Sequence, residues 1–323
     1  MQTAISFAPM EGITTALYRN IHREMFGGVA RYYTPFISPT STKSLSSKEL
    51  RDVLPENNTA AEIVPQILTR NAEHFLFTAE KLKLLGYHEI NLNLGCPSGT
   101  VVKKGKGSGF LAYPYELDAF FQHLFRHKDF PLSVKTRIGM KDEGEYDLLL
   151  YVFRKYAFSE LILHPRLQTD LYKRPVRMTA LDRTLSDAPW KMVYNGDIFT
   201  EECFDEFVRA YPKVETVMPG RGLIANPALA RQIMGGETLK KDELFEFADR
   251  IYKGYIEQYG GDAKNAVYRM KELWFYMGSS FEDAQRRTRD ICRASTPAEY
   301  AQCVDRLFAE KPLRERKQCG FHP

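Results

Sequence analysis

The chain has 323 residues, of which 44% are hydrophobic and 27% charged, a composition typical of an ordinary globular protein. This length suits one large barrel followed by a smaller accessory domain. The net charge of +4 excludes a uniformly basic nucleic-acid-binding protein, so a polyanionic partner would have to meet a local basic surface.

The five cysteines are scattered and form no Cys-x-x-Cys pair, which indicates neither a disulfide framework nor a zinc site. The N-terminal segment lacks a basic stretch followed by an apolar core. No apolar run approaches the roughly 18 residues that a membrane helix needs. We therefore expect a cytoplasmic protein without a bound metal or a membrane partner. We also expect a monomer, although nothing in the sequence determines the oligomeric state.

Short apolar runs alternate with helical patterns as far as Met218, which predicts βα units and a parallel sheet. Eight parallel strands close a (β/α)8 TIM barrel, whose chemistry lies on the loops after the strands. An open doubly wound sheet is the alternative, but no Gly-x-Gly-x-x-Gly follows the first strand. The eight strands are expected over Ala4–Phe7, Ala30–Tyr33, Glu62–Ile67, Glu89–Leu94, Leu132–Thr136, Glu160–His164, Lys191–Tyr194 and Glu215–Met218.

From about Lys240 the alternation stops, and helical patterns follow with breaks at Gly260-Gly261, Gly278 and Thr296-Pro297. This change predicts a smaller, all-helical C-terminal domain. We place the barrel domain at residues 1–238 and the helical domain at 239–323. Residues 38–58 are rich in Ser, Thr, Lys and Glu, which indicates a long exposed excursion after the second strand.

Polar or glycine-rich segments follow most of the predicted strands, which indicates a rim that binds a ligand. The turns after strands seven and eight read Asn-Gly-Asp and Gly-Arg-Gly, and such turns bring backbone N–H groups close to an anion. Either tripeptide alone would be read as a tight turn, but the two in register predict a phosphate-bearing ligand. The rim residues are Pro9, Met10, Glu11, Gln66, Cys96, Lys135, Arg137, His164, Arg166, Asn195, Gly196, Asp197, Gly220 and Arg221.

Three of these side chains allow more than one interpretation. Lys135 could face the anionic edge of a cofactor ring or form a rim salt bridge. His164 could bind a phosphate or a ring, or be a structural histidine. Gln66 both donates and accepts hydrogen bonds, which suits a ring with mixed edges.

The stretch "NLNLGCPS" ends a predicted strand and places Cys96 at the rim. A lone cysteine is often a buried small hydrophobe, but this one precedes a glycine-rich loop with Lys103, Lys104 and Lys106. Such a loop can fold over a substrate, and its cations suit a phosphate backbone. The thiol could be a proton donor or a nucleophile, and the residues alone leave both open.

The segments "APMEGIT", "NLNLGCPS", "VKTRIG", "LILHPR", "YNGDI" and "MPGRGLIANPAL" resemble the dihydrouridine synthase family, flavin enzymes that reduce uridine in RNA, chiefly transfer RNA. The resemblance runs from the first strand to about Pro227, and a helical domain follows in the expected place. It implies an FMN-binding barrel followed by a helical RNA-binding domain. FMN would be recharged by NADPH and supply a hydride, and Cys96 would supply the proton.

The resemblance also implies residue roles. Pro9, Met10 and Glu11 would line the flavin, with Gln66 and Lys135 at its ring. The ribityl-phosphate end would be held by His164, Asn195, Gly196, Asp197, Gly220 and Arg221. Asn93 would contact the uracil, and the other expected substrate contacts are Arg137, Arg166, Tyr172, Lys103, Lys104, Arg269 and Lys271.

The sequence departs from the family after the sixth strand, where it reads His164-Pro165-Arg166-Leu167 and has Asp170 in place of a glutamine. This departure lies in a substrate-contacting region. Ribosomal RNA therefore stays open as the substrate. So does an FMN barrel enzyme acting on a small molecule, such as a dihydroorotate dehydrogenase or an ene-reductase. A non-catalytic RNA-binding protein would be expected to lack Cys96 or Lys135, and both are present.

Overall fold

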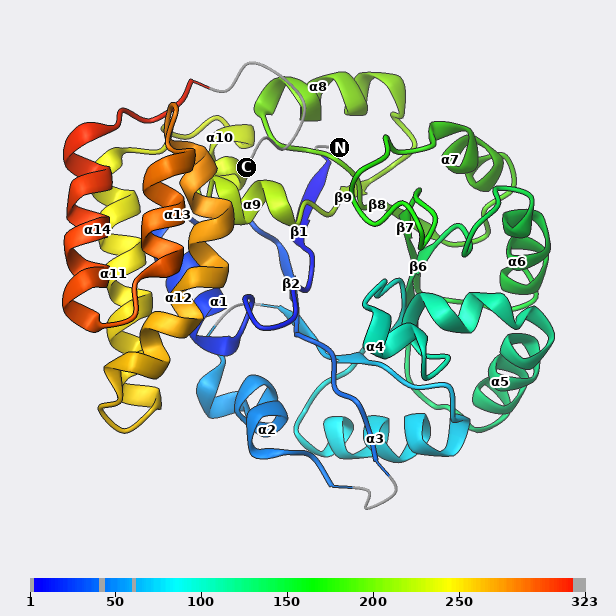
Figure 1. Cartoon of the computed structure of the whole chain (residues 1–323). Helices are drawn as coiled ribbons and strands as arrows, with labels where there is room; N and C mark the ends of the chain where they lie inside the picture. The colour runs from blue at the N-terminus through cyan, green and yellow to red at the C-terminus, as the bar shows by residue number, and fades with distance from the viewer. Residues whose placement is uncertain (1–2, 41–43, 60–61, 316–323) are drawn as a thin grey trace.

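The protein is described by a computed structural model that covers residues 3–40, 44–59 and 62–315. A parallel barrel is surrounded by helices, and further helices pack beside it (Figure 1). The predicted fold class is confirmed. The strands are β1 Ala4–Phe7, β2 Arg31–Tyr33, β3 Ile63–Val64, β4 Gln66–Ile67, β5 Ile90–Leu94, β6 Leu132–Arg137, β7 Glu160–His164, β8 Lys191–Tyr194 and β9 Thr216–Val217.

The third predicted strand is divided into β3 and β4 at Pro65, so the sheet has nine strands. Proline has no N–H to donate to a strand ladder, which interrupts the pairing at that residue. The strand order in the sheet is β3-β2-β1-β9-β8-β7-β6-β5-β4, so β3 and β4, the two halves of the predicted third strand, stand at opposite ends of the sheet. Because β3 and β4 are consecutive in the chain, the sheet nearly closes into a ring. A parallel bridge between Ile37 and Ile67 lies at the same junction.

Helices cover the outside of the barrel, and the strands bury apolar side chains on both faces. Side chains cap the first turns of several helices. The Asn71 side chain accepts a hydrogen bond from the backbone N–H of His74, and the Thr200 side chain accepts one from that of Cys203. The helices are α1 Ala16–Met25, α2 Ser47–Val53, α3 Ala72–Leu84, α4 Gly99–Val102, α5 Pro114–His127, α6 Glu145–Phe153, α7 Met178–Leu185, α8 Glu201–Ala210, α9 Arg221–Ala225 and α10 Leu229–Ile233, with 3-10 turns η1 Pro55–Asn57 and η2 Gly107–Ala112.

The excursion after β2 is less exposed than expected. Its described part contains α2, whose Asp52 is buried and accepts a 2.7 Å hydrogen bond from the backbone N–H of Ala16. Arg19 of α1 donates to the backbone oxygen of Asp52 at 2.7 Å. These contacts hold the excursion against the first helix of the barrel.

The C-terminal part is helical, as predicted, with α11 Lys241–Gln258, α12 Ala263–Met277, η3 Gly278–Ser280, α13 Gln285–Arg293 and α14 Pro297–Glu310. The break before α12 uses Gly260 and Gly261 at φ +63° and +94°, and Thr296 caps α14. Phe247 of α11 packs edge-on against Tyr18 of α1, with ring centres 5.3 Å apart. Within the described residues, no helix is long and apolar enough to cross a membrane.

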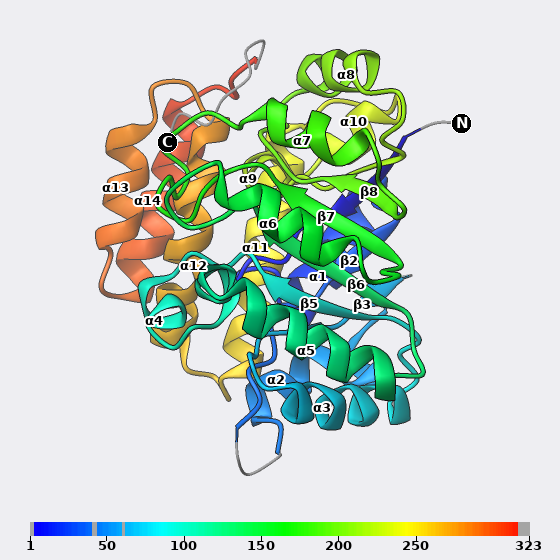
Figure 2. The same ribbon diagram turned by 90° about the vertical axis from the view of Figure 1, so that its right-hand side faces the viewer.

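All strands are parallel, so their carboxyl ends share one side of the barrel. Figure 2 shows the N-terminus on one side of the molecule and α4, α12 and α13 on the opposite side. Since α4 follows β5, that opposite side carries the carboxyl ends of the strands. The helical part therefore flanks the mouth of the barrel, where function is expected.

Candidate active site

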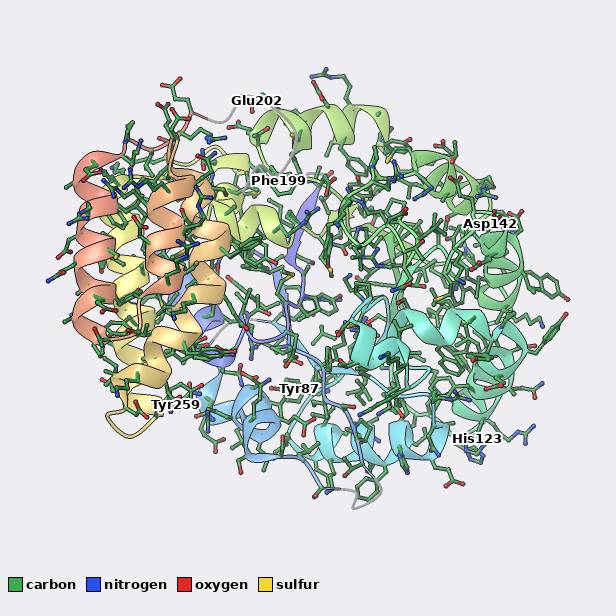
Figure 3. All side chains as sticks on the ribbon, in the orientation of Figure 1. Tyr87, His123, Asp142, Phe199, Glu202 and Tyr259 are labelled. Carbon is green, nitrogen blue, oxygen red and sulfur yellow. The ribbon has the colours of Figure 1, made fainter. Side chains whose placement is uncertain are left out.

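A cavity of about 50 Å³ opens at the carboxyl ends of β1, β6, β7, β8 and β9. It brings together all the predicted cofactor residues except Glu11 and Gln66. Phe199, labelled in Figure 3, joins them from the segment after β8. The lining comprises Ala8, Pro9, Met10, Lys135, His164, Tyr172, Asn195, Gly196, Asp197, Phe199, Gly220, Arg221 and Gly222.

Cations dominate the electrostatics of this cavity. Burial lowers the pKa of His164 well below its ordinary value, and the charges of Lys135, Arg137, Arg166 and Arg221 lower it further. His164 is therefore neutral at physiological pH. Asp197 accepts hydrogen bonds from Arg166 at 3.0 Å and from Arg221 at 2.6 Å. One carboxylate beside four cationic groups leaves an excess of positive charge, which suits an anionic ligand.

Two of the cations have unused donors. Burial lowers the pKa of Lys135 to about 7, aided by the charge of Arg137, and among the described residues none accepts a hydrogen bond from Lys135. Arg137 is buried and donates to the backbone oxygens of Gly95 at 3.0 Å and Leu167 at 2.8 Å. Among the described residues its buried Nη2 has no hydrogen-bond partner, and the guanidinium carbon lies 5.3 Å from the centre of the Tyr172 ring. An unpaired buried donor is costly, so this atom indicates that a ligand acceptor completes the site.

Tyr172 forms one wall of the cavity. Its ring stacks on His164 with centres 5.8 Å apart, and the guanidinium of Arg221 lies 4.3 Å from its centre. The loop that carries it is held by Asp170, which accepts from the backbone N–H of Leu167 at 2.8 Å and pairs with Arg177. The departure from the family at Asp170 thus has a structural role in this loop.

The turns after β8 and β9 approach each other closely. A Cβ on Gly222 would lie 2.0 Å from the backbone oxygen of Ile198, so only glycine fits there. Asn195 donates from Nδ2 to the backbone oxygen of Met218 at 2.5 Å, which joins the end of β8 to the end of β9. The two predicted phosphate turns are therefore held side by side.

Buried amides and a hydroxyl form a hydrogen-bonded chain inside the barrel. Asn93 donates to Gln66 at 2.7 Å, Gln66 donates to Asn91 at 2.8 Å, and Asn91 donates to Ser133 at 2.9 Å. At the mouth, Asn93 Oδ1 accepts from the backbone N–H groups of Gly95 at 3.0 Å and Cys96 at 2.9 Å. Gln66 thus lies outside the cavity lining and accepts a hydrogen bond from Asn93. Asn93 in turn holds the turn that carries Cys96.

Cys96 is half-buried and is a free thiol. Burial raises its pKa, as does the charge of Glu11, while a hydrogen bond from the Ser98 backbone and the charges of Arg137 and Lys135 oppose that rise. The thiol is therefore protonated at neutral pH, which favours a proton donor over a nucleophile. Ser108, in η2 of the following loop, donates to the Cys96 backbone oxygen at 2.8 Å from Oγ.

The remaining predicted residues lie outside the cavity. Lys103 and Lys104 are exposed where α4 ends, and Glu11 is exposed and pairs with Lys48 at 2.5 Å. Lys271 is half-buried on α12. Arg269 points toward the barrel and donates to the backbone oxygen of Gly12.

Sequence reasoning missed several residues that the structure brings to the site. Asn91 and Ser133 belong to the amide chain, and Phe199 lines the cavity. The signal for Asn91 is its spacing: it stands two residues before Asn93, so both face the barrel interior. Phe199 follows the strand end by several residues, and nothing in the local sequence distinguishes it from a core phenylalanine.

A parallel barrel whose strand ends carry a cationic cavity beside a protonated thiol defines a TIM-barrel enzyme. Among solved structures, morphinone reductase superposes with a TM-score of 0.52 at 11% identity, covering 74% of this chain and 87% of that one. Likeness at this identity concerns the fold alone.

The sequence comparisons define the family. A family model of the dihydrouridine synthases matches residues 6–310. A probable tRNA-dihydrouridine synthase of Staphylococcus epidermidis is 32% identical over 317 residues, which cover 95% of this chain and 94% of that protein. A protein of the same description from Staphylococcus aureus is 31% identical over 313 residues, covering 94% and 92%. The chain belongs to the dihydrouridine synthase family of oxidoreductases, as the motifs predicted.

Proposed function

We propose that this protein reduces the C5=C6 bond of specific uridines in tRNA to give 5,6-dihydrouridine, with FMN as cofactor and NADPH as reductant. The observation that carries the proposal is the protonated thiol of Cys96 beside a cavity with excess positive charge. The names of the relatives support tRNA as the substrate.

The residues at the mouth fit a phosphorylated flavin. Neither Nη2 of Arg137 nor the Lys135 side chain has a hydrogen-bond acceptor among the described residues, which supports an anionic or acceptor-rich ligand. The small cavity suits a phosphate, which His164, Asn195, Gly196, Gly220 and Arg221 would hold. Asp197 would act through Arg166 and Arg221, whose guanidinium groups it orients. When bound, the flavin supplies the hydride for one carbon of the C5=C6 bond.

Cys96 would supply the proton for the other carbon. The thiol gives up its proton, and the resulting thiolate takes up another from solvent before the next turnover. The charges of Lys135 and Arg137 stabilise that thiolate while burial disfavours it. The balance keeps the acid protonated between turnovers and still allows it to donate.

The uracil must leave its stack to reach this thiol, at a cost of about a few kcal/mol. Tyr172 is 41% exposed at the mouth, and we propose that its exposed part contacts the base. Asn93 accepts a hydrogen bond from the backbone N–H of Cys96, and Arg137 donates to the backbone oxygen of the preceding Gly95. We propose that Asn93, Arg137 and Arg166 orient the base.

Residues 239–323 are proposed as the RNA-binding domain. Arg286, Arg289 and Arg293 of α13 are exposed, and their spacing places them on one helix face. In the part of the chain that the structure describes, none of the three has a carboxylate partner. Lys103 and Lys104 are exposed directly after α4, and α4 lies on the same side of the molecule as α13 (Figure 2). Two groups of cations thus flank the mouth and can contact the RNA backbone.

The activity test uses purified protein, NADPH and total RNA from a strain that lacks dihydrouridine. A flavin absorption spectrum and new dihydrouridine in tRNA fragments by mass spectrometry are expected. Modified fragments of ribosomal RNA alone would contradict the proposed substrate. A flavoprotein without any RNA product would indicate a small-molecule oxidoreductase.

We further propose that the protein acts as a monomer in the cytoplasm. The Cys96 acid must stay a reduced thiol, and a reducing compartment keeps it so. Sedimentation of the purified holoenzyme tests the monomer, and a sedimenting dimer would contradict it.

A further inference from the structure

The loop after β1 is held by a residue of the helical part. Arg269 of α12 donates from Nη2 to the backbone oxygen of Gly12. Its guanidinium also lies 5.7 Å from the centre of the Tyr255 ring and 3.5 Å from Glu272, and the side chain is only 18% exposed. Arg269 thus joins the barrel, through Gly12, to α11 and α12 of the helical part.

This loop leads directly into the cavity. Pro9 and Met10 line the cavity, and Gly12 follows two residues later at φ +78°. A Cβ on Gly12 would lie 2.9 Å from a carboxylate oxygen of Glu272, so α12 packs against the glycine itself. The loop also has internal ties, since Thr14 Oγ1 accepts from the backbone N–H of Met10 at 2.9 Å.

The same helical segment reaches the other side of the cavity. Ser280, in η3 after α12, donates to the backbone oxygen of Ala225 in α9, the helix that begins at Arg221. Tyr276 of α12 lies close enough to Tyr172 and Arg221 to interact electrostatically with both. The end of α12 is therefore joined to the elements that follow β1 and β9, and both elements line the cavity.

We propose that Arg269 is a positioning residue for the cofactor site. Through its hydrogen bond to the Gly12 oxygen, Arg269 holds the Met10–Thr14 loop in place. This inference rests on the proposed function, in which a flavin occupies the cavity. Without the guanidinium, the Gly12 oxygen loses its only donor among the described residues and the left-handed turn has less support. We therefore expect the loop to shift at the cofactor site even though the hydrogen bonds between Met10 and Thr14 remain.

The alternative role for Arg269 is a phosphate contact with the RNA. A phosphate would have to replace the Gly12 oxygen, the Tyr255 ring and the Glu272 carboxylate as partners of a guanidinium that is mostly buried. Arg286, Arg289 and Arg293 of α13 have no carboxylate partner among the described residues, so they can bind a phosphate without breaking any such interaction. The geometry therefore favours the positioning role.

The test compares Arg269→Gln, Arg269→Lys and the unaltered holoenzyme. We expect R269Q to weaken FMN affinity by about tenfold and to shift the flavin absorption spectrum, because small displacements at a site are costly. The R269K protein keeps a cationic donor, and its FMN affinity is expected to lie between those of R269Q and the unaltered protein. Affinity for tRNA, measured at fixed salt, should change by less than about twofold in both variants.

Arg250→Gln is the matched control. Arg250 of α11 also joins the helical part to the barrel, through Glu24 at 2.6 Å, but Glu24 lies near the end of α1 opposite the mouth. R250Q should leave FMN affinity and the flavin spectrum unchanged. An equal loss of FMN affinity in R250Q and R269Q would overturn the inference in favour of general loosening between the two parts.

Two further outcomes separate the inference from the proposed function. R269Q with normal FMN affinity and weakened tRNA affinity would overturn the positioning role and make Arg269 an RNA contact. Failure of the unaltered protein to bind FMN would instead overturn the proposed cofactor. If R269Q does not fold, R269K carries the same comparison.

Discussion

At the scale of single residues, the site depends on groups whose protonation is set by burial. Cys96 keeps its proton because desolvation outweighs the nearby cations, and His164 stays neutral for the same physical reason. Lys135 is the exception, because its pKa of about 7 lets it change charge near physiological pH. Substitutions of Cys96 and of Lys135 can therefore test the proposed proton donor and the proposed anion site separately.

Replacement of Cys96 by alanine removes the proposed acid without touching the cavity lining. We expect C96A to bind FMN normally and to lose about 10²–10⁴-fold in uridine reduction, the range typical of general acid catalysis. Mass spectrometry of the RNA measures the product. Cys292→Ala, at a half-buried free cysteine of α13, is the control and should keep full activity. Full activity of C96A would exclude the acid role.

Lys135 makes the affinity for an anionic cofactor depend on pH. Its pKa is lowered to about 7, and a bound anion raises it, so binding takes up a proton. FMN affinity is therefore expected to fall as the pH rises above about 7. Binding titrations with FMN at a series of pH values between about 6 and 9 measure this effect. Lys135→Met should bind FMN weakly with a flat profile, and an equally steep profile in that variant would assign the effect to another group.

At the scale of elements, β5 and the loop after it form one unit. The amide chain fixes the strand end from below, and the loop returns over Cys96 through the Ser108 hydrogen bond. Gly107 makes this return possible, since its φ is +56° and a Cβ there would lie 2.9 Å from the Cys96 backbone oxygen.

Gly107→Ala should therefore loosen the loop. A left-handed alanine costs about 1–2 kcal/mol, and the clash with the Cys96 oxygen adds to that cost. We expect a lower midpoint in thermal unfolding and slower uridine reduction with unchanged FMN affinity. Gly99→Ala, where a Cβ meets no atom within 4 Å, is the control and should change neither quantity. Equal effects of the two substitutions would contradict this account of the loop.

At the scale of the whole molecule, two helices of the helical part make different contacts. Its α12 faces the barrel through Arg269, and η3 after it does so through Ser280. Its α13 carries an exposed row of arginines on the side where the barrel opens (Figure 2). One helix is thus suited to hold the catalytic part, and the other to meet a polyanion.

Reversal of the charge on the exposed arginines of α13 should weaken RNA binding without affecting the flavin site. Arg286→Glu, Arg289→Glu and Arg293→Glu combined should lower tRNA affinity and reduce the slope of log affinity against log salt by about one for each phosphate that the protein no longer neutralises. NADPH-driven flavin reduction should be unaffected. Arg306→Glu, an exposed arginine on α14, is the control and should leave the salt slope unchanged. An unaltered slope in the triple variant would remove α13 from the RNA surface.

Local patterns in the sequence were sufficient to predict the barrel, the helical tail and the set of residues at the strand ends. These patterns are alternating strands and helices, glycines in the turns, and polar residues at each strand end. Most of the predicted cofactor residues line the cavity because the carboxyl ends of parallel strands must meet on one side. The family motifs carry the same local information, and the comparisons confirm the family.

The directions of individual side chains and their partners became known only from the three-dimensional arrangement. Gln66 lies within the amide chain, Arg166 pairs with Asp197, and Arg269 reaches Gly12 across the interface between the two parts. Each of these interactions joins elements that are distant in the chain. Their partners depend on strand register and helix packing, which arise from the whole core, and no local pattern in the sequence encodes them.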